Sequence, residues 1–370
     1  MKRNSRIRLL LFLSLCLPFV SLNIAWATSS ATAAQCAVGV NVNSFQNFST
    51  DEQMTIVDQL KQNGVGYVRT SLRPDDKNMT LAKALQTAGI GLVLNIGWKV
   101  DANAPERQEY PRPHIRAARP LSRIDPGLSR DYFQTVFDKL DAYGVTLAGI
   151  EVGNEINWVD FNGDFPMPGR GKALSLGELS QDPVGKQVAD GLVKYVQLLV
   201  LLKQVRDRSK LNPHVPIISA GMATVSGGKW QADNKLDGVS IPVTYAFLRA
   251  HGLDALVDGY GVHSYPPQVT GDDKTALPQL RKYLNDNIFP NGNAKPFWLT
   301  EWGFGSDGSA AAENQRAHSV AATRAYFDNL CKQGRLKGVF WYMWNAPGND
   351  SIYRTGRLMP SGRLVVAPMK

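Results

Sequence analysis

The sequence predicts a single (β/α)₈ barrel, the TIM-barrel fold, over residues 35–370. Short apolar or β-branched runs alternate with longer helix-like stretches, and strict alternation implies a parallel sheet. The chain holds eight such strand–helix units, the number that closes a parallel sheet into a barrel. An open doubly wound sheet is the alternative, but the sequence contains no glycine-rich dinucleotide or phosphate fingerprint to favour it.

The first four units run from a β-branched strand to a buried apolar one. Residues 37–42 form the β-branched run, and the helix after it has cap candidates at Ser49 and Thr50 and a glycine stop at Gly64. A loop rich in proline and arginine, residues 97–126, precedes the third helix. The expected strands are residues 37–42, 67–71, 92–96 and 145–154, and the helices are residues 50–63, 80–88 and 127–143.

The last four units follow a second long loop, residues 157–183. The longest helix comes first, and its apolar stretch at 193–202 predicts deep packing. The eighth helix falls in the short tail after Asp350. The expected helices are residues 187–209, 243–250, 278–288 and 310–332, and the strands are residues 215–219, 257–265, 297–301 and 339–344.

The first residues are typical of an export signal. Four basic residues precede an apolar run at 9–20, and small residues gather at 31–34. A membrane anchor is the alternative, but Pro18, Ser21 and Asn23 interrupt the run, which falls short of ~20 apolar residues. We therefore expect a signal peptide at 1–34, a mature domain at 35–370 without a membrane span, and a secreted or periplasmic monomer.

Charge and cysteine content limit the partners. Removing the leader lowers the formal net charge from +9 to +5, since it deletes four basic residues and no acidic one. This surplus permits, but does not demand, an anionic polysaccharide. We find no zinc-spaced cysteines, basic helix or aromatic-interleaved basic motif that indicates nucleic acid, and we expect no metal and no cofactor.

Two cysteines remain after the leader, Cys36 and Cys331. An even pair in an exported protein favours a disulfide. Cys36 precedes the first strand and Cys331 ends the last long helix, and these two segments are neighbours in a closed barrel. Two unpaired buried thiols are the alternative.

Two glutamates stand at the ends of predicted strands. The fourth strand ends in Asn154 and Glu155, and residues 296–303 repeat the arrangement with Glu301 at the end of the seventh. In a barrel, catalytic groups come from strand ends and the loops after them. Two carboxyls raised there are what glycoside hydrolysis requires, one to protonate the leaving oxygen and one to attack or stabilise the sugar cation.

Further polar and aromatic residues fall at the same ends. Arg69 ends the second strand, His263 and Tyr265 end the sixth, and Trp344 ends the eighth. Random placement would not put this set there. A buried structural histidine is the alternative for His263.

These residues resemble clan A glycoside hydrolases, the superfamily of retaining (β/α)₈ glycosidases. The resemblance covers the mature chain in topology, but in sequence only these short motifs. It implies that Glu155 is the general acid/base and Glu301 the nucleophile, that Asn154 holds the substrate 2-hydroxyl, and that Tyr265 and Arg69 hydrogen-bond the nucleophile.

The family within the clan stays open. Gly-Asn-Glu-Ile at 153–156 is similar to the family 53 endo-galactanases, whereas His-Ser-Tyr at 263–265 and the tryptophan-rich eighth strand resemble families 5 and 39. Asn95 and Trp98 stand where many family 5 enzymes carry a histidine on strand three.

Two sets of residues are open to more than one interpretation. Trp98, Trp158 and Trp302 follow strand ends, where an indole ring can stack on a pyranose, although packing in the core is the alternative. Five arginines crowd residues 107–123, as a subsite for a charged glycan or as a solvated loop.

Together these observations predict an exported, metal-independent, retaining β-glycosidase that acts on the O-glycosidic bonds of a polysaccharide or oligosaccharide. A transglycosylase using the same two carboxyls is one alternative, and a barrel that binds carbohydrate without turnover is another. The sequence does not define the sugar, the linkage, or endo versus exo action.

Overall fold

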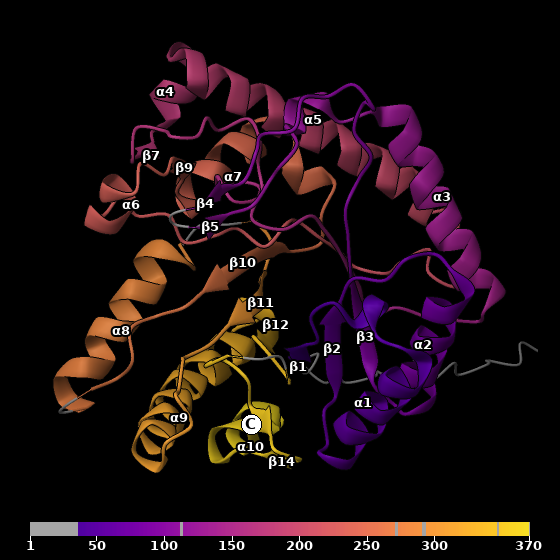
Figure 1. The fold of residues 1–370 in the computed structure, drawn as a ribbon, viewed down its shortest axis with the longest axis vertical. Helices are drawn as coiled ribbons and strands as arrows, with labels where there is room; N and C mark the ends of the chain where they lie inside the picture. Colours follow the sequence, from indigo (N-terminus) through magenta and orange to yellow (C-terminus); the bar gives the residue numbers. More distant parts are fainter. Residues whose placement is uncertain (1–35, 112–113, 271–272, 291–293, 346–347, 370) are drawn as a thin grey trace, which may run out of the picture. The chain divides into compact units, whose positions relative to one another are not determined.

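The structure is a computed structural model that describes residues 36–111, 114–270, 273–290, 294–345 and 348–369. It confirms the single (β/α)₈ barrel predicted from the sequence (Figure 1). The leader expected at residues 1–34 and Arg112 of the basic loop lie outside the described residues.

Eight parallel strands form the barrel. Their order in the sheet is β10–β11–β12–β1–β2–β3–β6–β8, so neighbours in the sheet are neighbours among the barrel strands along the chain. Isolated parallel bridges from Ile218 to Gly259 and from Met222 to Val262 join the two ends and nearly close it. The strands are β1 (Ala37–Asn41), β2 (Tyr67–Thr70), β3 (Gly91–Ile96), β6 (Gly149–Val152), β8 (Ile217–Ile218), β10 (Tyr260–Ser264), β11 (Phe297–Trp302) and β12 (Leu336–Trp341).

Helices follow the strands and begin at capping residues. Ser49 and Glu52 form a capping box on α1, and Asp125 caps α3 directly before Pro126. The eighth helix expected in the tail is α10. The α-helices are α1 (Thr50–Gln62), α2 (Asp76–Thr87), α3 (Pro126–Ala142), α4 (Leu176–Gln181), α5 (Pro183–Arg206), α6 (Lys229–Asp233), α7 (Ile241–Ala250), α8 (Asp273–Asn287), α9 (Ala310–Lys332) and α10 (Pro360–Val366).

Short elements decorate the loops of the barrel. Two of them, β4 and β5, form a hairpin in the long arginine-rich loop, where the sequence predicted no regular structure. The short loop elements are the 3₁₀ helices η1 (Phe45–Asn47), η2 (Leu121–Arg123) and η3 (Leu253–Ala255), and the strands β4 (Tyr110–Pro111), β5 (His114–Ile115), β7 (Ala173–Leu174), β9 (Gly238–Val239), β13 (Tyr353–Arg354) and β14 (Arg357–Leu358).

Side chains on the barrel strands alternate between the interior and the helices. Val38 and Val40 of β1 belong to the main core, which they share with helix residues such as Leu60 of α1. A second, smaller cluster draws one side chain from each of five strands and fills the barrel interior, as layers do in this fold. Its members are Ala37, Val93, Ile218, Trp298 and Phe340.

Polar residues occupy the next layer inside the barrel. Asn41 lies four residues after Ala37, and Asn95 lies two residues after Val93. Because side chains an even number of residues apart face the same side of a strand, both asparagine side chains point into the barrel. Arg69 is in register with Asn41, and Glu151 is in register with Asn95. The strand period therefore turns a set of polar side chains into the barrel near the carboxyl ends of the strands.

The disulfide predicted between Cys36 and Cys331 is present, with 5.8 Å between the two Cα atoms. It ties the residue before β1 to the last turn of α9, at the amino end of the barrel strands. Among the helices of the described residues, none has the length and hydrophobicity needed to cross a bilayer.

Candidate active site

One cleft of about 420 Å³ opens at the carboxyl ends of the barrel strands. Five of the residues predicted to bind substrate or act in catalysis line it, and they come from four parts of the chain. They are Arg69, Asn154, Glu155, Tyr265 and Glu301.

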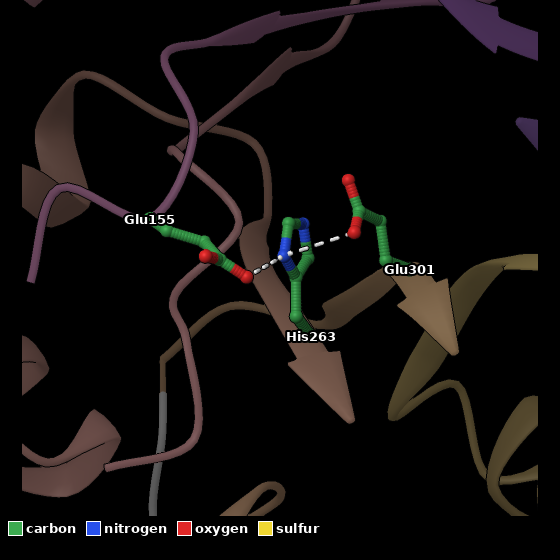
Figure 2. A group of neighbouring side chains, drawn as sticks. All are labelled: Glu155, His263 and Glu301. Carbon is green, nitrogen blue, oxygen red and sulfur yellow. Dashed lines mark hydrogen bonds and ion pairs between the residues drawn. The ribbon is translucent and has the colours of Figure 1, made fainter. Parts of the chain in front are cut away.

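The two glutamates lie on either side of His263 (Figure 2). A carboxylate oxygen of Glu155, one of Glu301 and a ring nitrogen of His263 all lie within 4.8 Å of one another. Nδ1 of His263 is 2.8 Å from Oε1 of Glu155 and 3.5 Å from Oε2 of Glu301. Two carboxyl groups remote in sequence therefore share one cleft.

His263 is buried between the carboxyls, and Gly221 makes room for it. A Cβ atom at Gly221 would lie 2.0 Å from Nε2 of His263, so only glycine fits there. Burial lowers the pKa of His263, but the charge of Glu301 and the hydrogen bond and charge of Glu155 outweigh burial and raise the pKa above its ordinary value. The imidazole is thus held toward its protonated form, with Nδ1–H directed at the carboxyls.

Glu155 sits on a strained turn at the end of the fourth barrel strand. Its φ of 44° lies in the left-handed region, which is uncommon for a residue with a side chain. Its amide donates to the carbonyl of Gly221 at 2.8 Å, and its own carbonyl accepts from the amide of Trp158 at 2.9 Å. Such strain costs about 1–3 kcal/mol and is concentrated at functional sites. The turn aims the carboxyl into the cleft.

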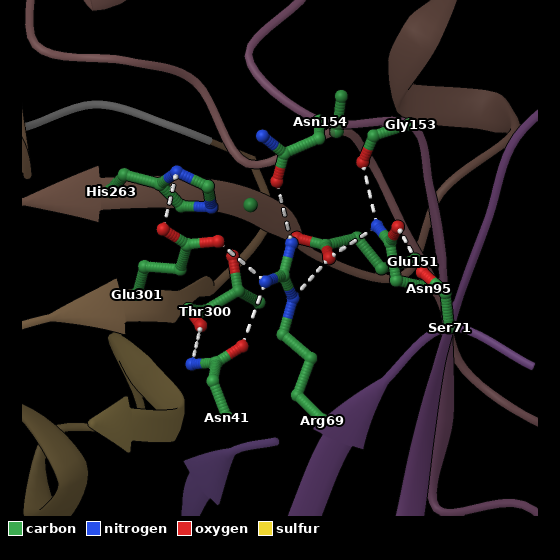
Figure 3. A network of polar contacts seen from close by, with 12 residues as sticks. Asn41, Arg69, Ser71, Asn95, Glu151, Gly153, Asn154, His263, Thr300 and Glu301 are labelled. Atoms are coloured by element: carbon green, nitrogen blue, oxygen red, sulfur yellow. Dashed lines mark hydrogen bonds and ion pairs between the residues drawn. The ribbon is translucent and has the colours of Figure 1, made fainter. Parts of the chain in front are cut away.

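Arg69 is the hub of the polar layer (Figure 3). Its Nε donates to Glu151 at 2.5 Å, and its Nη1 donates to Asn41 at 2.8 Å and to Glu301 at 2.7 Å. Its Nη2 donates to Oδ1 of Asn154 at 2.9 Å, which leaves the Nδ2 group of Asn154 as a donor toward the cleft. Every nitrogen of the guanidinium is therefore bonded, and the side chain is locked in one position.

The surroundings of Glu301 favour its ionised form. Burial raises the pKa of this carboxyl, but the charges of His263 and Arg69 and the hydrogen bond from Tyr265 outweigh burial and leave the pKa below its ordinary value. The Tyr265 hydroxyl donates to Oε2 of Glu301 at 2.7 Å. The support expected from Arg69 and Tyr265 is present, and His263 adds to it.

The four predicted tryptophans do not line the cleft. Trp302 and Trp344 are fully buried, and Trp344 stacks on Tyr353 at 4.8 Å. Strand β12 ends at Trp341, three residues earlier than the sequence predicted, which leaves Trp344 beyond the strand. Trp98 and Trp158 are half-buried, and the Trp98 ring meets Tyr195 edge-on at 6.2 Å. The aromatic side chains that do line the cleft are Phe161, Tyr265 and Tyr342.

No role was predicted from the sequence for three polar residues that lie behind the two glutamates, Asn41, Asn95 and Glu151. Glu151 accepts from Nε of Arg69 at 2.5 Å and from Nδ2 of Asn95 at 2.8 Å. Asn41 donates to the carbonyls of Thr300 at 2.9 Å and of Trp341 at 3.2 Å, and so ties three strands together. The alternation of side chains along a strand could have indicated these residues, because inward-facing positions recur at every second residue.

The residue types found in metal sites also occur here, in Glu155, His263 and Glu301. Among the described residues, this group has donor atoms close enough together to hold an ion. Two ligands of one tetrahedral zinc ion lie about 3.3 Å apart. The 2.8 Å contact between His263 and Glu155 is shorter than this and is a hydrogen bond.

No protein-family model and no curated protein matches this sequence. Solved structures do resemble its fold. The virulence factor SghA from Agrobacterium tumefaciens is 12% identical over 90% of this chain and 96% of its own, with a TM-score of 0.52. SghA in complex with its substrate analog salicin gives a TM-score of 0.51, with 12% identity over 90% of this chain and 95% of its own. A GH39 enzyme from Xanthomonas axonopodis pv. citri is 15% identical over 90% of this chain and 65% of its own, with a TM-score of 0.49. At such identities the likeness concerns the fold.

Proposed function

We propose that this protein is a retaining β-glycosidase that hydrolyses O-glycosidic bonds of a polysaccharide or oligosaccharide, with Glu155 as general acid/base and Glu301 as nucleophile. The observation that carries the proposal is the approach of the two carboxyls to within 4.8 Å in one cleft. Retaining glycosidases need carboxyl groups about 5–5.5 Å apart, whereas inverting ones need about 6.5–9.5 Å.

In the first step, Oε of Glu301 attacks the anomeric carbon while Glu155 gives its proton to the leaving oxygen. The glycosidic bond breaks as the glycosyl–Glu301 ester forms. Arg69 and Tyr265 each donate to Glu301 and keep it ionised before attack. Asn154 supports the step with its free Nδ2 group, which is directed to bind a sugar hydroxyl.

In the second step, Glu155 is ionised and takes a proton from water, whose oxygen attacks the anomeric carbon and breaks the ester. The negative charge on Glu301 has then moved to Glu155. His263 Nδ1 lies within reach of both carboxyls, at 2.8 Å and 3.5 Å, so its proton stabilises whichever of them is charged. The same residue pair thus serves as acid in one step and base in the other.

The protein is also proposed to be exported as a monomer after removal of residues 1–34. The Cys36–Cys331 disulfide supports the export, because such bonds persist in oxidising compartments outside the cytosol. Expression with the native leader and amino-terminal sequencing of the exported chain tests it. A mature chain that begins near residue 35 is expected, and an uncleaved chain in the membrane fraction contradicts the proposal.

Release of reducing ends over a panel of β-linked polysaccharides tests the activity. Salicin is tested beside the panel, because it is the substrate analog in the SghA complex. The unmodified chain should hydrolyse at least one member, and Glu301→Ala should lose turnover and form a glycosyl azide when azide is added. A fully active Glu301→Ala protein rules the mechanism out.

A further inference from the structure

The arginine-rich loop at residues 107–123 has a single described arginine in the cleft. Arg107 donates to the carbonyls of Arg116 and Val159, Arg119 faces Glu106 at 3.9 Å, and Arg123 faces Asp101 at 2.5 Å. Of the loop's arginines that the structure describes, Arg116 alone lines the cleft that holds the two glutamates. The loop as a whole is therefore structural, and its one candidate for substrate contact is Arg116.

Arg116 is held in place on two sides. Oδ1 of Asp160 accepts a hydrogen bond from the Arg116 amide at 2.8 Å, and Oδ2 of Asp160 forms an ion pair with Arg116 Nε at 3.1 Å. The guanidinium lies over the ring of Phe161, with 4.4 Å between its carbon and the ring centroid. Both partners belong to the segment that follows Glu155, so the guanidinium is fixed relative to the proposed acid/base.

The remaining edge of the guanidinium is open. The side chain of Arg116 is 57% exposed, and within the described residues its side-chain polar contact is the one that Nε makes with Asp160. Two parallel Nη–H groups are thus left to meet a ligand in the cleft. Both oxygens of Asp160 contact Arg116 and so hold it from one side.

A fixed pair of parallel donors on a cation matches the two oxygens of a carboxylate, whereas a neutral hydroxyl accepts from one donor at a time. We propose that Arg116 is a specificity-determining residue that binds the carboxylate of a uronic acid unit, so that the substrate is a β-linked acidic glycan. This inference rests on the proposed glycosidase function and specifies its substrate class. The net charge of +5 expected for the mature chain favours approach of such a polyanion.

Binding to matched oligosaccharides tests the proposal without turnover. In the Glu301→Gln background, calorimetry compares hexasaccharides of β-1,4-linked glucuronate and mannuronate with the corresponding neutral glucose and mannose hexamers. At least one acidic member should bind more tightly than its neutral counterpart. Adding Arg116→Ala should weaken that acidic ligand by about 10- to 100-fold, the effect of losing charge-assisted hydrogen bonds, and change neutral binding less than about twofold.

Two further variants control the comparison. Arg119→Ala removes a neighbouring loop arginine outside the cleft and should leave all affinities unchanged. Arg116→Lys keeps the positive charge but lacks the two parallel N–H donors of the guanidinium. It should therefore retain only part of the preference for acidic over neutral hexamers. Circular dichroism of each variant establishes that it is folded.

The outcomes separate the inference from the proposed function. Equal weakening of acidic and neutral ligands by Arg116→Ala, no weakening of either, or binding of neutral hexamers alone overturns the carboxylate assignment while leaving a glycosidase. The carboxylate assignment is also overturned if none of the hexamers binds and the unmodified chain hydrolyses neutral polymers. Absence of both binding and hydrolysis contradicts the proposed function itself and the substrate class with it.

Discussion

Replacing Glu151 tests whether the charge behind Arg69 supports the site. Glu151 is fully buried and accepts from Arg69 at 2.5 Å and from Asn95 at 2.8 Å. Removing one partner of a buried ion pair costs about 3–5 kcal/mol, because the other charge loses its compensation. Arg69 keeps Glu301 as a partner, so for Glu151→Ala we expect the lower end, about 3 kcal/mol of unfolding free energy. Glu151→Gln keeps the volume and an acceptor for Arg69 but removes the opposing charge, which should cost about 1–2 kcal/mol.

Both Glu151→Ala and Glu151→Gln should also lower activity, although Glu151 is not expected to touch the substrate. Without the Glu151 carboxylate, Arg69 is held less firmly against Glu301 and Asn154. A loss of about 1.4–2.8 kcal/mol in transition-state stabilisation is a 10- to 100-fold drop in kcat. Urea unfolding at constant pH measures the stability, and initial rates on the best substrate of the panel measure kcat and KM.

A second buried ion pair supplies the matched control. Glu313 faces Arg316 at 2.6 Å, both side chains are buried, and neither lines the cleft. Glu313→Gln should therefore lose a similar amount of stability with kcat retained. If Glu151→Gln and Glu313→Gln lower stability alike and both keep full kcat, the reasoning about Arg69 is wrong. Unchanged stability in Glu151→Ala refutes the energetic part.

Three further perturbations probe the rest of the account. The pKa of His263 is raised in the folded chain, so its protonation stabilises the fold fully below the unfolded pKa of ~6.5, and this contribution is lost as pH rises through the folded pKa. The unfolding free energy, measured with urea, should therefore fall more steeply over this pH range in the unmodified chain than in His263→Gln. Parallel curves for the two proteins contradict the prediction. Replacing Cys36 and Cys331 by serine should lower the unfolding free energy by about 2–5 kcal/mol with kcat unchanged, because the bond lies at the opposite end of the strands from the cleft, and a folded variant with reduced kcat counts against this placement. Gly221→Ala should displace His263 and cost about 1–3 kcal/mol by overpacking, with a clear loss of kcat. Gly177→Ala, where a Cβ meets no atom within 4 Å, should keep kcat and lose no stability. Equal behaviour of the two variants argues against the close packing at His263.

The barrel could be predicted because its signals are local. Apolar runs and cap residues mark individual strands and helices, and their strict alternation leaves few topologies. Element boundaries differ by a few residues. Helix α5 begins at Pro183, four residues before the expected start, because Asp182 caps the helix and Pro183 fits its first position.

The end of the eighth strand was wrong for a different reason. The apolar and aromatic run continues past Trp341, so hydrophobicity alone extended the strand to Trp344. In the structure the chain leaves the barrel after Trp341, and Trp344 turns back into the core against Tyr353. A tryptophan near a strand end is equally suited to a core or to a sugar platform, and tertiary packing makes the choice.

The carboxyl pair was accessible from sequence, whereas its supporting residues were not. Glu155 and Glu301 stand at recognisable strand ends, so the fold alone predicts that they meet. Glu151 and Asn41 act through partners on other strands, and which strands face each other at one depth depends on barrel register. The contact of Arg116 with Asp160 joins two long loops, for which the sequence offers no periodic signal.

The stereochemistry of the first product tests the two-carboxyl mechanism most directly. Proton NMR follows the anomeric signals during the first minutes of hydrolysis of a β-linked substrate, before mutarotation mixes the anomers. Attack by Glu301 followed by attack of water inverts the anomeric carbon twice, so the β anomer should appear first. First appearance of the α anomer would mean direct attack by water, and Glu301 could not be the nucleophile.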